Sequence, residues 1–211
     1  MTVVKYLLQT KKQIMDIWFR PLVWMDYRLG VLLAVVIPVA LLVWALFQKQ
    51  EAMQRLLIIY WRVASLLMIT VYLLIPDWKV GFISGLAARI LIAISLWFWV
   101  DLNEEIRDIP QSMIKLVFTS WRWAMTAYCV LGAIAKSIFL PCGLSSATMK
   151  TNFCQVWLEA PEAYRNFFHN KPGNEGFLGF MGAVGLVIYV IYLAYFVLIR
   201  LGKQGRSALE Q

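Results

Sequence analysis

The sequence predicts an all-α fold, namely a polytopic membrane helix bundle of about five transmembrane helices preceded by an N-terminal interfacial amphipathic helix. Two observations support this class. Hydrophobic residues make up 61% of the 211-residue chain and charged residues 15%, whereas a soluble domain is about half apolar and a quarter charged. The apolar residues also gather in runs of roughly 20 residues, and a run of that length spans a hydrocarbon core of about 30 Å.

The predicted elements follow in order along the chain. Residues 1–28 form a lead whose apolar side chains fall roughly on one side of a helix, as in a helix that lies in the membrane interface. The short links between the first four spans predict an antiparallel, up-and-down bundle in one domain. A long loop at 136–175 precedes the last span, and a polar tail occupies 199–211. The five predicted spans lie at about 29–47, 55–75, 80–100, 114–135 and 177–198.

The net charge of +8 would suggest nucleic acid binding in a soluble protein. Here the cations lie in the loops and near the ends of the predicted spans, where they contact anionic headgroups. No basic stripe interleaved with aromatic residues occurs in a polar region. We therefore expect membrane lipids as partners and no nucleic acid.

Three arginines inside the predicted spans are the strongest functional signal. A charge at the centre of a transmembrane helix costs at least about 2.5–3.5 kcal/mol and is rarely left unpaired. Arg62 and Arg122 lie toward the face that carries the acidic link 101–108. They predict either an ion-pair cluster that binds an anion or a headgroup, or side chains that snorkel to the interface. Arg89 lies deeper and needs a partner within the bundle or a bound anionic group, and we expect a packing role for it. The predicted intramembrane charge cluster comprises Arg62, Arg89, Arg122, Asp101, Glu104 and Glu105.

The residues of a conventional enzyme or cofactor site are missing from the sequence. No predicted span contains a histidine or a carboxylate, so haem ligation by an intramembrane imidazole and the usual proton relay of a transporter are not expected. The single histidine, His169, has no Cys or His at ligand spacing, and Glu104 and Glu105 lack the histidine of a di-iron site. No nucleotide-binding, hydrolase or zinc-protease motif occurs. We predict no catalytic, cofactor-binding or metal-binding residue, no cofactor, and no enzyme activity.

The cysteines bear on the orientation of the chain. Cys142 and Cys154 lie in the same long loop, within range of a disulfide. A disulfide there would place the loop in an oxidising compartment such as a lumen or a periplasm, and with five spans the C-terminal tail then faces the cytoplasm. The alternative is a pair of free thiols, and the distribution of Lys and Arg hardly decides between the two orientations.

Small and aromatic residues indicate where helices or ligands meet. Small residues four apart, such as Gly179 and Ala183, predict close helix contacts within the chain or with another subunit. The tryptophans gather near the ends of the predicted spans, as in interfacial belts. The alternative is a pigment or quinone pocket, for which residues 97–99 and 121–123 are the candidates.

Four segments carry a resemblance to a known family. The strings FRPLVWMDYRL at 19–29, RLLIIYWRVASLL at 55–67, SLWFWVDLNEEI at 95–106 and RLGKQGRSA at 200–208 resemble an uncharacterised family of multi-span membrane proteins from cyanobacteria. The resemblance implies a thylakoid or plasma membrane and a link to photosynthetic membranes. It implies no catalytic residues.

Three hypotheses about function follow. The first is a non-enzymatic membrane protein that associates with a photosynthetic or respiratory membrane complex, as an accessory subunit or an assembly factor. The second is a small anion transporter or channel that uses the intramembrane arginines. The third, a lipid- or pigment-handling enzyme that uses Asp101, Glu104 and Glu105, has the weakest support because no nucleophile or repeated acidic motif accompanies these acids.

Overall fold

The computed structural model describes residues 17–169, 173–204 and 206–208, and every regular element in these residues is helical. The predicted all-α class is therefore confirmed. Most of the predicted amphipathic lead falls on residues 1–16, outside the described part of the chain. The rest of that lead belongs to a long helix, which begins at Arg20 and not near residue 29. The helix can begin there because Pro21 lies in its first turn, where a missing N–H is tolerated.

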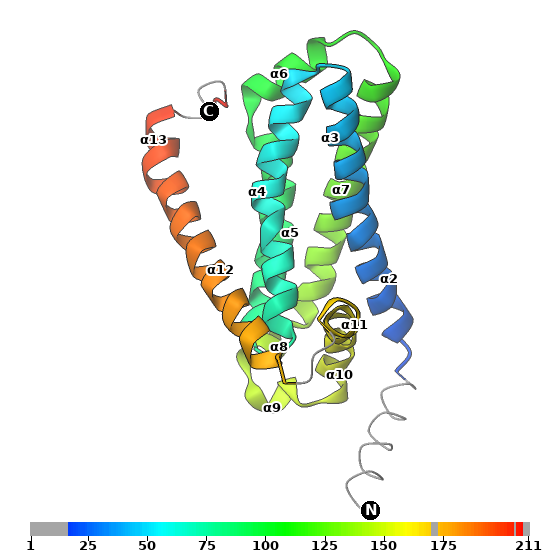
Figure 1. Ribbon diagram of the computed structural model, residues 1–211, viewed down its shortest axis with the longest axis vertical. Helices are drawn as coiled ribbons and strands as arrows, with labels where there is room; N and C mark the ends of the chain where they lie inside the picture. The colour runs from blue at the N-terminus through cyan, green and yellow to red at the C-terminus, as the bar shows by residue number, and fades with distance from the viewer. Residues whose placement is uncertain (1–16, 170–172, 205, 209–211) are drawn as a thin grey trace, which may run out of the picture.

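The long helices between residues 20 and 138 form a bundle of four rods, which stand side by side (Figure 1). Rods that follow one another in sequence pack together, and the first rod also packs against the last, so the four rods close into a ring around a common core. Tyr60 and Phe118 are the largest fully buried side chains of this core. The elements of the bundle are α2 (Arg20–Val31), the π-helical turn η1 (Leu32–Val36) and α3 (Ile37–Phe47), which together make the first rod, then α4 (Glu51–Leu74), α5 (Val80–Phe98), the short helix α6 (Val100–Asp108) and α7 (Met113–Ile138).

Among the described residues, four helices are long and apolar enough to cross a membrane. They indicate that the protein is integrated in a membrane. The fourth predicted span, 114–135, lies within α7, which has 26 residues but is not one of the four, so the predicted number of five is not confirmed. The reason is that α7 carries polar side chains that bond inside the bundle, as described below. The four helices are Arg20–Phe47, Glu51–Leu74, Val80–Phe98 and Glu175–Arg200.

A proline in the first rod is accommodated by a neighbouring helix. Pro38 has no N–H, so it cannot bond the carbonyl group of Ala34 one turn earlier. The hydroxyl of Tyr60 in α4 donates to that carbonyl oxygen instead, at 2.9 Å. The π-helical turn η1 directly precedes this position. Buried helix interruptions persist in membrane proteins when a neighbour satisfies the freed backbone group in this way.

The predicted long loop is a helical cap at the end of the bundle where α2 begins (Figure 1). A disulfide joins Cys142 and Cys154 across the cap. The cap also holds the first rod, because Glu159 accepts hydrogen bonds from Arg20 at 2.9 Å and from the indole of Trp24 at 2.8 Å. The cap consists of α8 (Leu140–Leu144), α9 (Ser146–Met149), α10 (Asn152–Gln155), the short turn η2 (Val156–Leu158) and α11 (Glu159–Phe168).

The disulfide predicts a simple labelling result. Denatured without a reductant, the protein is expected to react with maleimide at one thiol, because Cys129 is the free cysteine. After reduction, all three cysteines of the chain should react. Mass spectrometry of the labelled protein counts the thiols, and a Cys154→Ser variant is the control, with two reactive thiols under both conditions. Three reactive thiols in the unreduced wild-type protein would contradict the pairing.

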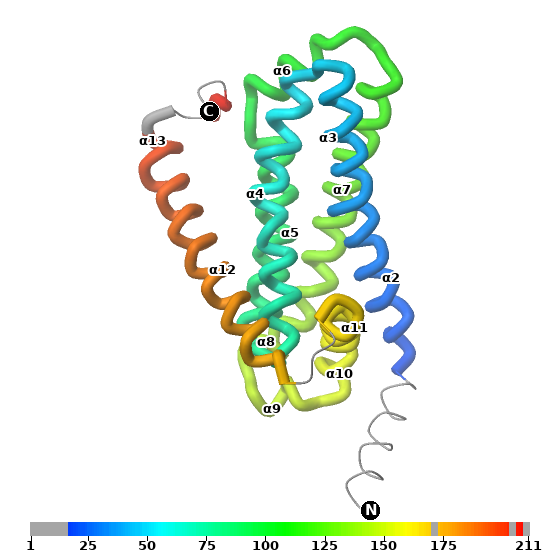
Figure 2. Tube along the Cα trace, in the orientation of Figure 1, coloured from blue at the N-terminus to red at the C-terminus, as the bar shows by residue number. Residues whose placement is uncertain are grey.

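The last long helix stands apart from the ring. α12 (Glu175–Tyr195) packs against α4 near the cap, and then leans away from the bundle through the π-helical turn η3 (Phe196–Arg200) to α13 (Leu201–Gln204) (Figure 2). Glycines make the close approach possible, since a Cβ at Gly179 would overlap Pro76 and one at Gly182 would press on Tyr72. The small-residue spacing predicted at Gly179 is thus used for a contact within the chain.

Candidate functional site

Arg89 has its charge partner inside the bundle. The side chain of Arg89 in α5 is 4% exposed, and its Nη2 lies 2.6 Å from both carboxylate oxygens of Asp26 in α2. The hydroxyl of Tyr128 in α7 accepts a further hydrogen bond from the same nitrogen at 3.1 Å, and donates to the backbone oxygen of Asp26 at 2.9 Å. The sequence predicted that Arg89 needs a partner. It also predicted that no carboxylate lies in a span, and this was wrong, because α2 carries Asp26 into the first rod.

A glycine in α7 makes room for the Arg89 guanidinium. A Cβ at Gly132 would overlap Nη1 of Arg89. A side chain at position 132 would therefore displace the arginine from Asp26. The other two nitrogens of the guanidinium, Nε and Nη1, are buried without a hydrogen-bond partner in the described residues. The positive charge is thus neutralised by a single carboxylate and held in place by packing on three helices.

Arg122 binds acceptors around the end of a helix, and its hydrogen bond to the acidic link 101–108 is with Asn103 and not with a carboxylate. The last carbonyl groups of a helix have no partner within it, and α5 ends at Phe98, directly before α6 begins at Val100. Nη2 of Arg122 donates to the backbone oxygen of Leu96 at 2.6 Å and to the side-chain oxygen of Asn103 at 2.5 Å. Its guanidinium carbon lies 4.2 Å above the ring of Trp97. A cation at a helix C-terminus also interacts favourably with the helix dipole, so Arg122 has a structural role here.

The C-terminal tail completes the same corner between α5 and α6. Arg206 donates to the backbone oxygen of Phe98 at 2.8 Å. Asp101 accepts a hydrogen bond from the backbone N–H of Ala208 at 2.6 Å and one from the hydroxyl of Ser207. Asn103 of α6 donates its side-chain N–H to the backbone oxygen of Trp97 at 3.1 Å. Donors from α6, α7 and the tail therefore satisfy the carbonyl groups with which α5 ends. This network ties residues 206–208 to the end of the bundle opposite the cap (Figure 1).

The predicted intramembrane charge cluster is not assembled. Arg89 pairs with Asp26, Arg122 caps α5, and Asp101 binds the tail, while Glu104 and Glu105 are exposed on α6. The prediction was wrong in placing these groups together, because it treated charges on one face as mutual partners. Backbone groups at the α5–α6 junction took those bonds instead.

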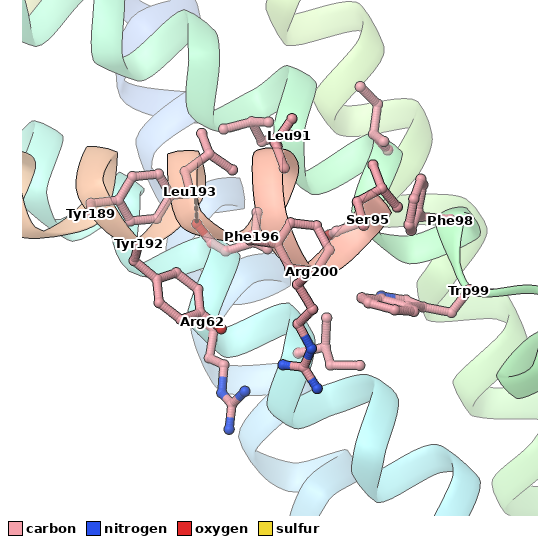
Figure 3. A pocket seen from close by; sticks show the side chains of 15 residues that line it. Arg62, Leu91, Ser95, Phe98, Trp99, Tyr189, Tyr192, Leu193, Phe196 and Arg200 are labelled. Atoms are coloured by element: carbon pink, nitrogen blue, oxygen red, sulfur yellow. Dashed lines mark hydrogen bonds between the residues drawn. The ribbon is translucent and has the colours of Figure 1, made fainter. Parts of the chain in front are cut away.

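The remaining arginine, Arg62, lines an apolar groove between α4, α5 and α12 (Figure 3). The groove has a volume of about 190 Å³. Arg62 is exposed, and its side chain makes no hydrogen bond, ion pair or ring contact with any residue that the structure describes. Figure 3 shows Arg62 and Arg200 pointing to the same side of the groove. The walls are formed mainly by Leu91, Ile94, Phe98, Trp99, Leu193 and Phe196.

Residues 97–99 and residues 121–123, the two aromatic triplets that the sequence offered as candidates for a pigment or quinone pocket, have different roles in the structure. Trp99 and Phe98 line the groove, whereas Trp97 donates its indole N–H to Thr126 of α7 at 2.8 Å. Trp121 donates its indole N–H to the backbone oxygen of Leu33 in η1, at 2.9 Å. The first triplet therefore contributes to a pocket, and Trp121 of the second serves helix packing.

His169 directly follows the last helix of the cap and packs against the rings of Tyr72 and Tyr164. Its ring lies 3.4 Å, through Nε2, from the hydroxyl of Tyr72. The pKa of the neighbouring Tyr164 is raised to about 12, mainly because its hydroxyl is shielded from water and also because it is hydrogen-bonded to Tyr72. No group of three His, Cys, Asp or Glu side chains with the spacing of a metal site occurs among the described residues.

Comparison with known families identifies the chain at the family level. A protein-family model matches residues 20–209, and its description is a protein of unknown function (DUF3177). The chain belongs to the DUF3177 family. The DUF3177 match begins at residue 20, where α2 begins, so it includes Asp26, Arg62, Arg89 and Arg122. No curated protein and no solved structure matches the chain.

Proposed function

We propose that this protein is a non-enzymatic integral membrane protein that binds a photosynthetic membrane complex, as an accessory subunit or an assembly factor. The observation that carries the proposal is the position of α12. Of its most apolar 18-residue window, 11% is buried, against 44% for α4. Because a lipid chain is as apolar as a leucine side chain, exposure alone does not require a protein partner. A helix that leaves its own bundle, however, offers a surface against which the helices of another subunit can pack.

The outer face of α12 is well suited to such packing. Val187 and Ile191 lie one helical turn apart and are 58% and 64% exposed. They lie away from Gly179 and Gly182, which face α4. Other large exposed apolar side chains on the same helix and its continuation include Phe177, Phe180, Met181, Val184, Ile188, Val190 and Leu198.

The interior arginines support a non-transporting role. An anion route would need guanidinium groups that are open to a passing ion. Arg89 is neutralised by Asp26, and Arg122 is engaged by a carbonyl group and by Asn103. The alternative function, a small anion transporter or channel, therefore has less support. Its test is anion flux in reconstituted vesicles, compared between the wild type and an Arg89→Met variant.

The membrane and the orientation are also part of the proposal. The resemblance to cyanobacterial membrane proteins supports a thylakoid or plasma membrane. The disulfide of the cap supports an oxidising compartment on that side. Residues 206–208 of the tail lie at the opposite end of the bundle (Figure 1), which supports a cytoplasmic C-terminus.

The test is recovery of a partner from membranes solubilised in a mild detergent. We expect the tagged wild-type protein to co-migrate with a larger complex on a native gel, and mass spectrometry to identify subunits of that complex. A Val187→Trp/Ile191→Trp variant should lose most of the partner, because the bulky rings disturb the packing surface. The matched control is Leu131→Trp/Ile134→Trp on α7, where both side chains are similarly exposed. Migration of the wild-type protein as a lone species would overturn the proposal.

A further inference from the structure

The three arginines of the predicted spans differ in one respect that points to a ligand. Arg89 and Arg122 each have compensating groups within the bundle. Arg62, in the middle of α4, has none among the described residues, although its helix is apolar enough to cross a membrane. A charge within an apolar span is rarely left without a partner. The group that compensates Arg62 is therefore not one of the described residues, and a ligand from the membrane can supply it.

The groove beside Arg62 indicates the shape of that group. Its walls are almost wholly apolar. The hydroxyl groups of Ser95 and Tyr189 are used within the protein, because they donate to the backbone oxygens of Ile92 and Val63. Its volume of about 190 Å³ is below the roughly 300 Å³ at which pockets begin to enclose a whole small molecule. An occupant would therefore lie only partly in the groove. This suits a flexible chain whose remainder lies in the surrounding bilayer.

The charges at the groove indicate the sign of the headgroup. Arg62 and Arg200 come from different helices and point to the same side of the groove (Figure 3). No carboxylate of the described residues lines it. Arginine is well suited to phosphate, because its guanidinium offers parallel N–H donors.

We propose that the groove between α4, α5 and α12 binds an anionic membrane phospholipid, with the phosphate at Arg62 and one acyl chain along Leu91, Phe98 and Phe196. The lipid fills the space between α12 and the ring of helices, and so holds α12 at its angle to the bundle. This site is separate from the outer face of α12 that carries Val187 and Ile191. It does not depend on the proposed partner.

The test compares two lipids with identical acyl chains on the delipidated full-length protein. Native mass spectrometry measures the retention of phosphatidylglycerol and phosphatidylcholine. We expect the wild type to bind phosphatidylglycerol about tenfold more tightly. Both lipids carry a phosphate, but the quaternary ammonium of phosphatidylcholine cancels its charge, whereas phosphatidylglycerol keeps a net negative charge beside the two arginines that line the groove. Arg62→Gln should abolish this preference, and Arg62→Lys should keep part of it. The control is Arg107→Gln, which removes one positive charge from the exposed surface of α6 and should keep the full preference.

Two further arms separate the groove from a general attraction to anions. Leu193→Trp fills the groove and should lower the retention of both lipids. Glycerophosphate, which has no acyl chain, should not displace the bound phosphatidylglycerol. Equal retention of the two lipids by the wild type, or equal effects of Arg62→Gln and Arg107→Gln, would overturn the proposal and would mean that Arg62 only snorkels to the headgroups.

Discussion

Replacing Asp26 with alanine is expected to lower the free energy of unfolding by about 3–5 kcal/mol, because it leaves the buried guanidinium of Arg89 without a counter-charge. The side chains of Arg89 and Asp26 are 4% and 19% exposed, and both carboxylate oxygens lie 2.6 Å from the same nitrogen. Unfolding in detergent micelles, followed by circular dichroism, measures the change. Glu105→Ala is the control, since Glu105 is exposed on α6 and its removal should change little.

Removing both members of the pair should be far less harmful than removing one. A buried ion pair can be replaced by apolar residues of similar size with little loss, or with a gain, in stability. We therefore expect Asp26→Leu/Arg89→Met to lose much less stability than the sum of the losses in Asp26→Leu and in Arg89→Met, which is the signature of direct coupling in a double-mutant cycle. Additive losses from the two changes would contradict the assignment of Asp26 as the partner of Arg89.

The second large effect is expected at Gly132. In most helices a change from glycine to alanine is favourable by up to about 1 kcal/mol. At position 132 the new Cβ would overlap the guanidinium of Arg89, so the arginine must move away from Asp26. We expect Gly132→Ala to destabilise the protein by about 2–4 kcal/mol, from the loss of much of the pair and from overpacking.

A second glycine provides a control of opposite sign. A Cβ at Gly176, in the first turn of α12, meets nothing within 4 Å. Gly176→Ala should therefore leave stability unchanged or raise it slightly. The same micelle unfolding experiment compares the two variants. A neutral Gly132→Ala variant would show that the guanidinium has room to move without losing its partner.

The sequence predicted the helices well because membrane spans depend on local composition. The runs around α4, α5 and α12 are apolar enough to be recognised without any tertiary contact. The pairing of Cys142 with Cys154 was also within reach, because the two residues are near each other in one loop. The helical character of that loop was not predicted, since its short helices carry no long apolar run.

The partners of the arginines could not be predicted in the same way. Asp26 is 63 residues from Arg89 in sequence, and the predicted first span began after it. The signal that was available is Pro21, which favours a helix start near residue 20 and would have placed Asp26 within the first rod. For Arg122 no local signal exists, because its acceptor is a backbone oxygen that is free only where α5 ends.

One experiment can test whether the buried Asp26–Arg89 pair serves stability while the outer face of α12 binds the partner. Partner recovery from solubilised membranes is measured for Asp26→Leu/Arg89→Met and for Val187→Trp/Ile191→Trp, after both have been shown to fold. We expect the first variant to keep its partner, because the buried pair serves only to hold the helices together, and the second to lose it. A stable Asp26→Leu/Arg89→Met protein that loses its partner, beside an α12 variant that keeps it, would contradict this view of the molecule.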